Sequence, residues 1–307
     1  MTTTNEAVLH ARQVKQARSD RFRPYFVLAP AFLLTIGILI PFFVAIYLSL
    51  TDISLRSQNF SFVGLSNYAA MFRNPDFYHA VGVSLRYSLW TTGVEMLLGL
   101  GVAMLLNEEH RLARVMRLLL TFPLMVAPVI ATLIWQLMTS PSVGIVANWL
   151  RRIGLGEFQW GAATGSAMFS VVIIDVWVYT PFVIILVLAG LRGLPAEPYE
   201  AASIDGAGPL TVFRSITLPM ITPFLLIALI FRLMLSLQEF GIIFALTKGG
   251  PGDALVSMSL YSYQQGFQFY DLAKSIPVMF LLYLVVYVAA NFLINSWRRA
   301  QSHAAGE

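Results

Sequence analysis

The sequence contains no cysteine and only three lysines, Lys15, Lys248 and Lys274. Without cysteine there can be no disulfide, no thiolate metal site and no cysteine nucleophile. None of the lysines stands in a Gly-x-x-x-x-Gly-Lys-Ser/Thr sequence, which excludes a Walker A phosphate-binding loop. His-Glu-x-x-His and Gly-x-Ser-x-Gly are absent as well, and the four histidines lie far apart in the chain. The sequence therefore predicts neither an enzyme nor a metal site.

Charge is also scarce, because charged residues make up 12% of the 307 residues while hydrophobic residues make up 57%. A soluble domain usually carries about 25% charged residues. The mean hydropathy of +0.71 points the same way. Basic residues are spread in short runs between apolar stretches rather than gathered on one face, which argues against nucleic-acid binding and is typical of membrane proteins.

Six stretches are apolar over about the 20 residues that a helix needs to cross a bilayer. They are residues 25–50, 80–106, 115–138, 167–191, 222–246 and 275–296. Strands are not expected, because open sheet edges cannot be satisfied in hydrocarbon. The predicted fold is an all-α integral membrane protein with about six transmembrane helices in residues 25–296, between an N-terminal tail (1–24) and a C-terminal tail (297–307).

The distribution of lysine and arginine predicts the orientation. With the N-terminus inside, the inner segments hold twelve of these residues and the outer segments six, which favours cytoplasmic termini at both ends. Pro123, Pro128 and Pro181 each remove a helix hydrogen bond and favour a kink, either for packing or as a hinge. The amphipathic stretch 143–153 is expected to lie along the outer membrane surface.

The inner segment 192–221 differs from a tight turn. Pro198 suits the first turn of a helix, Glu197 and Glu200 favour the positive end of its dipole, and Gly206 suits a left-handed C-terminal end. These signals predict an isolated helix of about two turns on the cytoplasmic side.

A helix this short is unstable alone in water and must dock on something. Ala201, Ala202 and Ser203 permit close approach of a partner, and Glu200 and Asp205 offer charges to pair. Packing beneath the bundle of its own chain is the alternative that these residues leave open.

The same segment carries a motif at long spacing: Glu200-Ala201-Ala202, three residues, Gly206, nine residues, then 216–219 (Ile-Thr-Leu-Pro). It resembles the EAA loop of bacterial binding-protein-dependent ABC importer permeases. Asn67-Tyr68, 105–107 (Leu-Leu-Asn) and 249–251 (Gly-Gly-Pro) resemble the carbohydrate branch of that family. More narrowly, they resemble the first permease of heterodimeric sugar and sugar-alcohol systems, related to the larger maltose permease subunit. The chain lacks that subunit's extra N-terminal spans and large periplasmic insertion.

The resemblance implies a mechanism and a set of partners. The chain would reside in the bacterial cytoplasmic (inner) membrane with a second homologous permease, two copies of a cytoplasmic ATPase subunit and an extracytoplasmic solute-binding protein. ATP and Mg would bind to the ATPase, and this chain would bind no cofactor. Glu200 would face a basic residue in a groove of the ATPase, and Gly206 would end the helix. A carbohydrate-like small molecule would pass by alternating access.

Charged residues within spans are costly and mark either pathways or buried pairs. The sequence places Arg86, Glu95, Asp175, Arg232 and Glu239 in such positions. From a rise of about 1.5 Å per residue, Glu95 and Arg232 fall at one depth, and Arg86, Asp175 and Glu239 at another. We therefore expect Glu95 to pair with Arg232, and Arg86 with Asp175 or Glu239.

A sugar requires polar groups for its hydroxyls and an aromatic face for stacking. Gln238, Glu239 and Phe240, with Trp177 and Tyr179, are candidates for the substrate pathway; Trp177 and Tyr179 are alternatively packing or interfacial aromatics. A second functional hypothesis is an ion-coupled secondary transporter that uses the intramembrane carboxylates.

Overall fold

The computed structural model describes residues 25, 28–57, 60–108, 111–154, 158 and 160–304. In this part of the chain the ordered elements are helices, joined by loops with two isolated β-bridges. The predicted N-terminal tail, residues 1–24, lies outside the described residues. At the other end the last helix, α13 (Leu272–Ala304), extends well into the predicted C-terminal tail.

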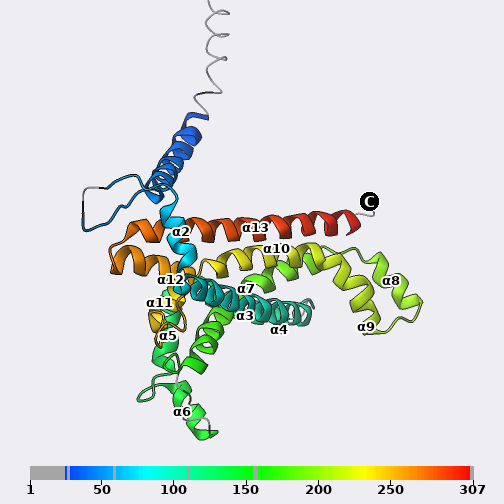
Figure 1. The fold of residues 1–307 in the computed structure, drawn as a ribbon. Coiled ribbons are helices and arrows are strands. Elements are labelled where there is room, and N and C mark those ends of the chain that lie inside the picture. The colour runs from blue at the N-terminus through cyan, green and yellow to red at the C-terminus, as the bar shows by residue number, and fades with distance from the viewer. Residues whose placement is uncertain are drawn as a thin grey trace, which may run out of the picture.

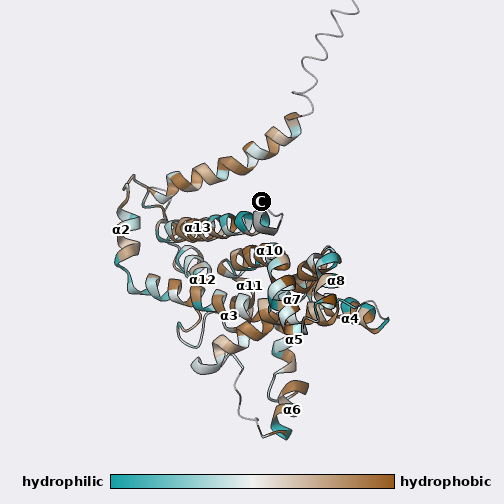
Figure 2. Ribbon diagram, turned by 90° about the vertical axis from the view of Figure 1, so that its right-hand side faces the viewer, coloured by the Kyte–Doolittle hydropathy of each residue, from teal (hydrophilic) through white to brown (hydrophobic). Residues whose placement is uncertain are grey.

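Five helical segments in the described residues are long and apolar enough to cross a membrane. They are Leu28–Ser49, α3 (Pro75–Leu105), α7 (Thr164–Arg192), Pro209–Leu237 and α13. Hydrophobic residues dominate these helices in Figure 2. A sixth crossing is possible through a bent helix pair. The predicted all-α membrane fold is confirmed.

The third predicted span, residues 115–138, is not one continuous helix. It consists of α4 (Arg111–Thr121), a 3-10 turn (Phe122–Met125) and α5 (Pro128–Met138), bent by 101° at the break. Pro128 has no backbone N–H and disfavours helical geometry at the preceding Ala127, whose ψ is 134°. The kink favoured by the prolines is therefore large enough to interrupt the span.

The prediction of a continuous fifth span over residues 222–246 is wrong at its C-terminal end. Helix α10 (Leu218–Leu237) ends at Leu237, and a separate helix, α11 (Gly241–Thr247), starts after Phe240. No proline causes this break. Instead, Oε1 of Glu239 accepts a hydrogen bond from the backbone N–H of Ile242 at 2.7 Å and satisfies the start of α11.

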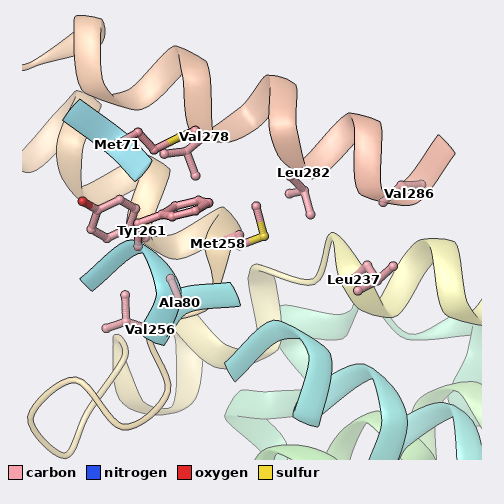
Figure 3. Packing of buried hydrophobic residues seen from close by; sticks show 10 residues of the cluster. Met71, Ala80, Leu237, Val256, Met258, Tyr261, Val278, Leu282 and Val286 are labelled. Carbon is pink, nitrogen blue, oxygen red and sulfur yellow. The ribbon is translucent and has the colours of Figure 1, made fainter. Parts of the chain in front are cut away.

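The central bundle is formed by α3, α7 and α10, and α13 packs along α10. At one end α2 (Ser66–Arg73), α12 (Met258–Tyr263) and the π-helical turn Gln264–Gln268 cover the start of α13. Met71, Met258, Tyr261, Val278 and Leu282 form a buried cluster there (Figure 3). Helix Leu28–Ser49 has no buried residue in its apolar window.

At the opposite end of the bundle, α8 (Glu197–Ile204) and α9 (Pro209–Val212) project outward, near the end of α13 (Figure 1). Beyond α5, the short helix α6 (Ile145–Arg152) forms within the predicted amphipathic stretch and has no buried residue. A second π-helical turn, Phe213–Thr217, leads from α9 into α10.

A close contact between α7 and α10 depends on the absence of a side chain at Gly190. A Cβ atom at this position would lie 2.5 Å from Cγ and 2.9 Å from Cβ of Phe224. Gly93 of α3 is also helical, but a Cβ there would meet nothing within 4 Å. The two glycines therefore offer a matched comparison.

We predict that Gly190→Ala destabilises the folded protein by about 1–3 kcal/mol because the added methyl group overpacks the contact. Gly93→Ala should be neutral or slightly stabilising, since alanine has the higher helix propensity. Thermal unfolding of the detergent-solubilised variants measures both effects. Equal melting temperatures for the two variants would contradict the tight α7–α10 contact.

Candidate functional site

The short helix predicted from the EAA-like segment is present as α8. Pro198 lies in its first turn, with Glu197 and Glu200 as the acidic residues there. Gly206 has a φ of +68°, the left-handed conformation that glycine adopts without strain. The N–H of Ala207 donates to the carbonyl of Ala202 at 2.9 Å, which closes the end of the helix.

Most of α8 is exposed. Ala202 is its one buried residue, whereas Glu200, Ala201, Ser203 and Asp205 are exposed. Ile204 is 87% exposed, and sequence reasoning did not single it out. A large apolar side chain at the end of a short polar helix was the available signal. The bundle of this chain therefore does not cover α8, and its exposed surface is open to a partner.

The base of α8 is nevertheless attached to the bundle. The hydroxyl of Tyr199 donates to Oγ1 of Thr217 at 3.1 Å, which links α8 to the start of α10. A cavity of about 380 Å³ lies beside this bond, between the ends of α3 and α7 and the loop; Met104, Asn107, Leu191 and Leu194 are among its lining residues. The hydrogen bond and the intervening loop thus connect α8 to the start of α10 and the end of α7.

Within the bundle, one fully buried guanidinium joins three helices. Arg232 of α10 donates from Nε to Oε2 of Glu95 on α3, and from Nη2 to Oε1 of the same carboxylate at 2.8 Å. Nη2 also donates to Oδ2 of Asp175 on α7 at 3.1 Å. All three side chains are at most 1% exposed. The expected Glu95–Arg232 pair is present, and Asp175 is its third member.

The second expected pairing, of Arg86 with Asp175 or Glu239, is wrong. Arg86 is exposed and its Nε donates to the carbonyl of Gly82 in its own helix. Glu239 caps α11 instead. Helix face decides this outcome, because Arg86 lies off the buried stripe of α3 that contains Ser88 and Glu95. The depth of a residue in the membrane does not determine the direction in which its side chain points.

The surroundings of Arg232 are aromatic and polar. Its Cζ lies 4.0 Å from the ring centroid of Tyr179, a cation–π contact, and the hydroxyls of Ser88 and Ser236 are hydrogen-bonded nearby. Arg232 Nη1 has no hydrogen-bond partner among the described residues. One guanidinium nitrogen of the cluster therefore remains available to donate a hydrogen bond.

Some of the predicted pathway residues lie in an apolar cluster, whereas Gln238 is exposed. Tyr179 and Phe240 belong to one apolar cluster at the α10–α11 break, and Trp177 contacts Trp135 of that cluster edge-on, with ring centroids 6.1 Å apart. Gln238 is exposed, and its Nε2 donates to the carbonyl of Met234.

Sequence reasoning missed further aromatic members of this cluster. Phe244 stacks on Phe240 with centroids 5.0 Å apart, and Tyr263 lies 5.2 Å from Phe240. Tyr263 comes from the distant helix α12, so no local pattern links it to Phe240. The three rings pack on one another, and Gln238 and Glu239 directly precede Phe240 in the chain.

The structure is thus a bundle of helices long and apolar enough to cross a membrane, with the short helix α8 projecting from one end. Residues 95–305 match the family of binding-protein-dependent transport system inner membrane components. The chain is 33% identical over 302 residues to a probable ABC transporter permease protein y4oQ of Sinorhizobium fredii, with 97% of each chain covered. It is 36% identical over 240 residues to the trehalose/maltose transport system permease protein MalF of Thermococcus litoralis, covering 78% of this chain and 81% of the relative.

In fold, the chain is similar to a chain of a bacterial ABC transporter involved in the import of the acidic polysaccharide alginate. The TM-score is 0.80 at 22% identity, with 94% of this chain and 99% of the other covered. The chain therefore belongs to the family of inner membrane components of binding-protein-dependent transport systems, and it is a multi-pass permease subunit of an ABC importer.

We predict that Arg232→Ala destabilises the protein by about 3–5 kcal/mol, because it leaves two buried carboxylates without their cation. Arg86→Ala removes the same side chain from an exposed position and should change stability by less than about 0.5 kcal/mol. Chemical or thermal unfolding in detergent compares the two. An Arg232→Ala protein as stable as Arg86→Ala would contradict the structural role of the ion cluster.

Proposed function

We propose that this permease conducts a sugar, polyol or sugar derivative from an extracytoplasmic binding protein into the cytoplasm, driven by an ATPase that holds α8. The observation that carries the proposal is the exposure of α8. Helices of two turns are unstable in isolation, yet Glu200, Asp205 and the apolar Ile204 have no cover from their own chain. A groove on another subunit supplies what is missing.

The remaining partners are proposed from the family to which the chain belongs. A second, similar permease completes the pathway, and two copies of the ATPase carry ATP and Mg, so that this chain holds no cofactor. The excess of lysine and arginine in the segments that include α8 supports cytoplasmic termini at both ends.

A carbohydrate cargo is supported by two observations. The relative from Thermococcus litoralis is named as a trehalose/maltose transport system permease protein. The aromatic cluster at the α10–α11 break contains Phe240 and Tyr263, and the polar residues Gln238 and Glu239 directly precede Phe240. Aromatic faces with adjacent hydrogen-bonding groups suit the apolar and hydroxylated faces of a sugar.

The ion-coupled alternative draws less support from the geometry. Glu95 and Asp175 are both hydrogen-bonded to Arg232, and Glu239 accepts from the backbone of α11. The intramembrane carboxylates are thus engaged in holding helices together.

Reversing the charge at Glu200 tests the ATPase contact. We expect Glu200→Lys to reduce uptake and co-purification of the ATPase subunit by tenfold or more, since a charge pair at an interface typically contributes a few kcal/mol. Glu197→Lys on the same helical turn is the matched control, because it also opposes the helix dipole but lies outside the motif. Full uptake and assembly with Glu200→Lys would refute the contact.

Substitution at the break tests the cargo. We predict that Phe240→Ala lowers the transport rate about tenfold, because a lost stacking face costs roughly 1–1.5 kcal/mol, while the ATPase remains bound. Trp149→Ala on α6 is the control, because it removes an aromatic side chain that is 66% exposed and lies outside this cluster. Radiolabelled-sugar uptake in proteoliposomes measures both, and unchanged uptake with Phe240→Ala would remove this residue from the pathway.

A further inference from the structure

Three arginines converge on a hollow between α4 and α7. Two adjoining cavities of about 610 and 330 Å³ lie there, and Arg117, Thr121 and Arg192 border both of them. Arg114 borders the larger cavity. Arg192 is the last residue of α7, so the hollow lies at the end of the bundle from which α8 projects.

These arginines have no acidic partner in the described part of the chain. None of the three takes part in the ion pairs between described residues, whose cations are His79, Arg232 and Lys274. The Nε of Arg117 donates to the carbonyl of Ala113 at 3.2 Å, but its Nη1 is buried and lacks an acceptor. A buried guanidinium nitrogen without an acceptor is costly, which points to a ligand that supplies one.

The walls of the hollow are apolar. Val115 and Leu118 contribute from α4, and Pro181, Ile185 and Leu188 from α7. Leu118 is 75% exposed and Ile185 is 44% exposed, as expected for side chains that face lipid. A small inorganic anion would use the three guanidinium groups and leave these walls uncovered. A ligand with a phosphate and hydrocarbon chains matches both parts of the surface.

We propose that the α4–α7 groove, defined by Arg114, Arg117, Thr121, Arg192 and the apolar walls named above, binds an acidic phospholipid such as phosphatidylglycerol. The guanidinium groups contact the phosphate, and the acyl chains cover Leu118 and Ile185. The charge-based orientation places this lipid in the cytoplasmic leaflet, where basic pockets between helices recognise acidic headgroups.

Such a lipid would lie at the base of the α8 loop. Arg192 directly precedes the residues that lead to α8, and the Pro195–Ala196 part of that loop borders the cavity under Tyr199. A bound headgroup fixes the end of α7 against α4 at this point. The inference is independent of the cargo and of the ATPase contact.

The test uses the full-length permease purified with its partner subunits and incorporated in nanodiscs that contain phosphatidylglycerol and phosphatidylcholine. Native mass spectrometry counts the lipids that remain bound after release from the disc. We expect retained phosphatidylglycerol to fall about fivefold for each of Arg114→Ala and Arg192→Ala, from the usual contribution of one basic residue beside an acidic membrane. These two residues are exposed, so their replacement does not disturb the core.

Arg151→Ala and Arg152→Ala on α6 are the matched controls, because they remove the same charge from exposed positions elsewhere. They should leave lipid retention unchanged. Inorganic phosphate up to millimolar concentrations should not displace the lipid. Equal retention in the groove and control variants would overturn the proposal, as would displacement by phosphate alone. Dissociation of the second permease from the groove variants would also overturn it, since the groove would then be a protein interface.

Discussion

The guanidinium of Arg232 is the point on which the bundle depends. It holds a carboxylate from α3 and another from α7 while belonging to α10, and all three side chains are at most 1% exposed. Hydrophobic contact between helices has no driving force against lipid, so a buried ionic contact of this kind fixes which faces meet. The ring of Tyr179 covers the same cation at 4.0 Å.

The position of Arg232 along α10 connects the two ends of the molecule. The helix begins at Leu218, directly after the π-helical turn that contains Thr217, the partner of Tyr199 on α8. It stops at Leu237, one residue before the break that Glu239 caps. Arg232 therefore joins α10 to α3 and α7 at a point between the exposed helix α8 and the aromatic cluster around Phe240.

Sequence reasoning succeeded where the signals are local or strongly periodic. Pro198, the acidic residues of the first turn and Gly206 together define α8, and the structure contains that helix with Gly206 at a φ of +68°. The apolar stretches gave the membrane helices, and the depth argument gave the Glu95–Arg232 pair. These predictions depend either on residues close together in sequence or on the number of residues between a side chain and the end of its span.

The failures concern side-chain direction and contacts between distant segments. Arg86 was paired by depth although it lies on the outer face of α3, and a helical projection of the buried stripe would have excluded it. The break after Leu237 lacks proline or glycine until Gly241, so only the cap by Glu239 reveals it. The contact of Tyr263 with Phe240 joins α12 to the break and has no local signature.

The absence of native cysteine makes a direct measurement of the central claim possible, because a single introduced cysteine is the only reactive thiol. Ile204→Cys places it at a position of α8 where the native side chain is 87% exposed. A membrane-impermeant maleimide should label this thiol in inside-out vesicles that contain the permeases alone, and bound ATPase subunits should protect it. Equal labelling with and without the ATPase would contradict the account in which α8 is held by that subunit.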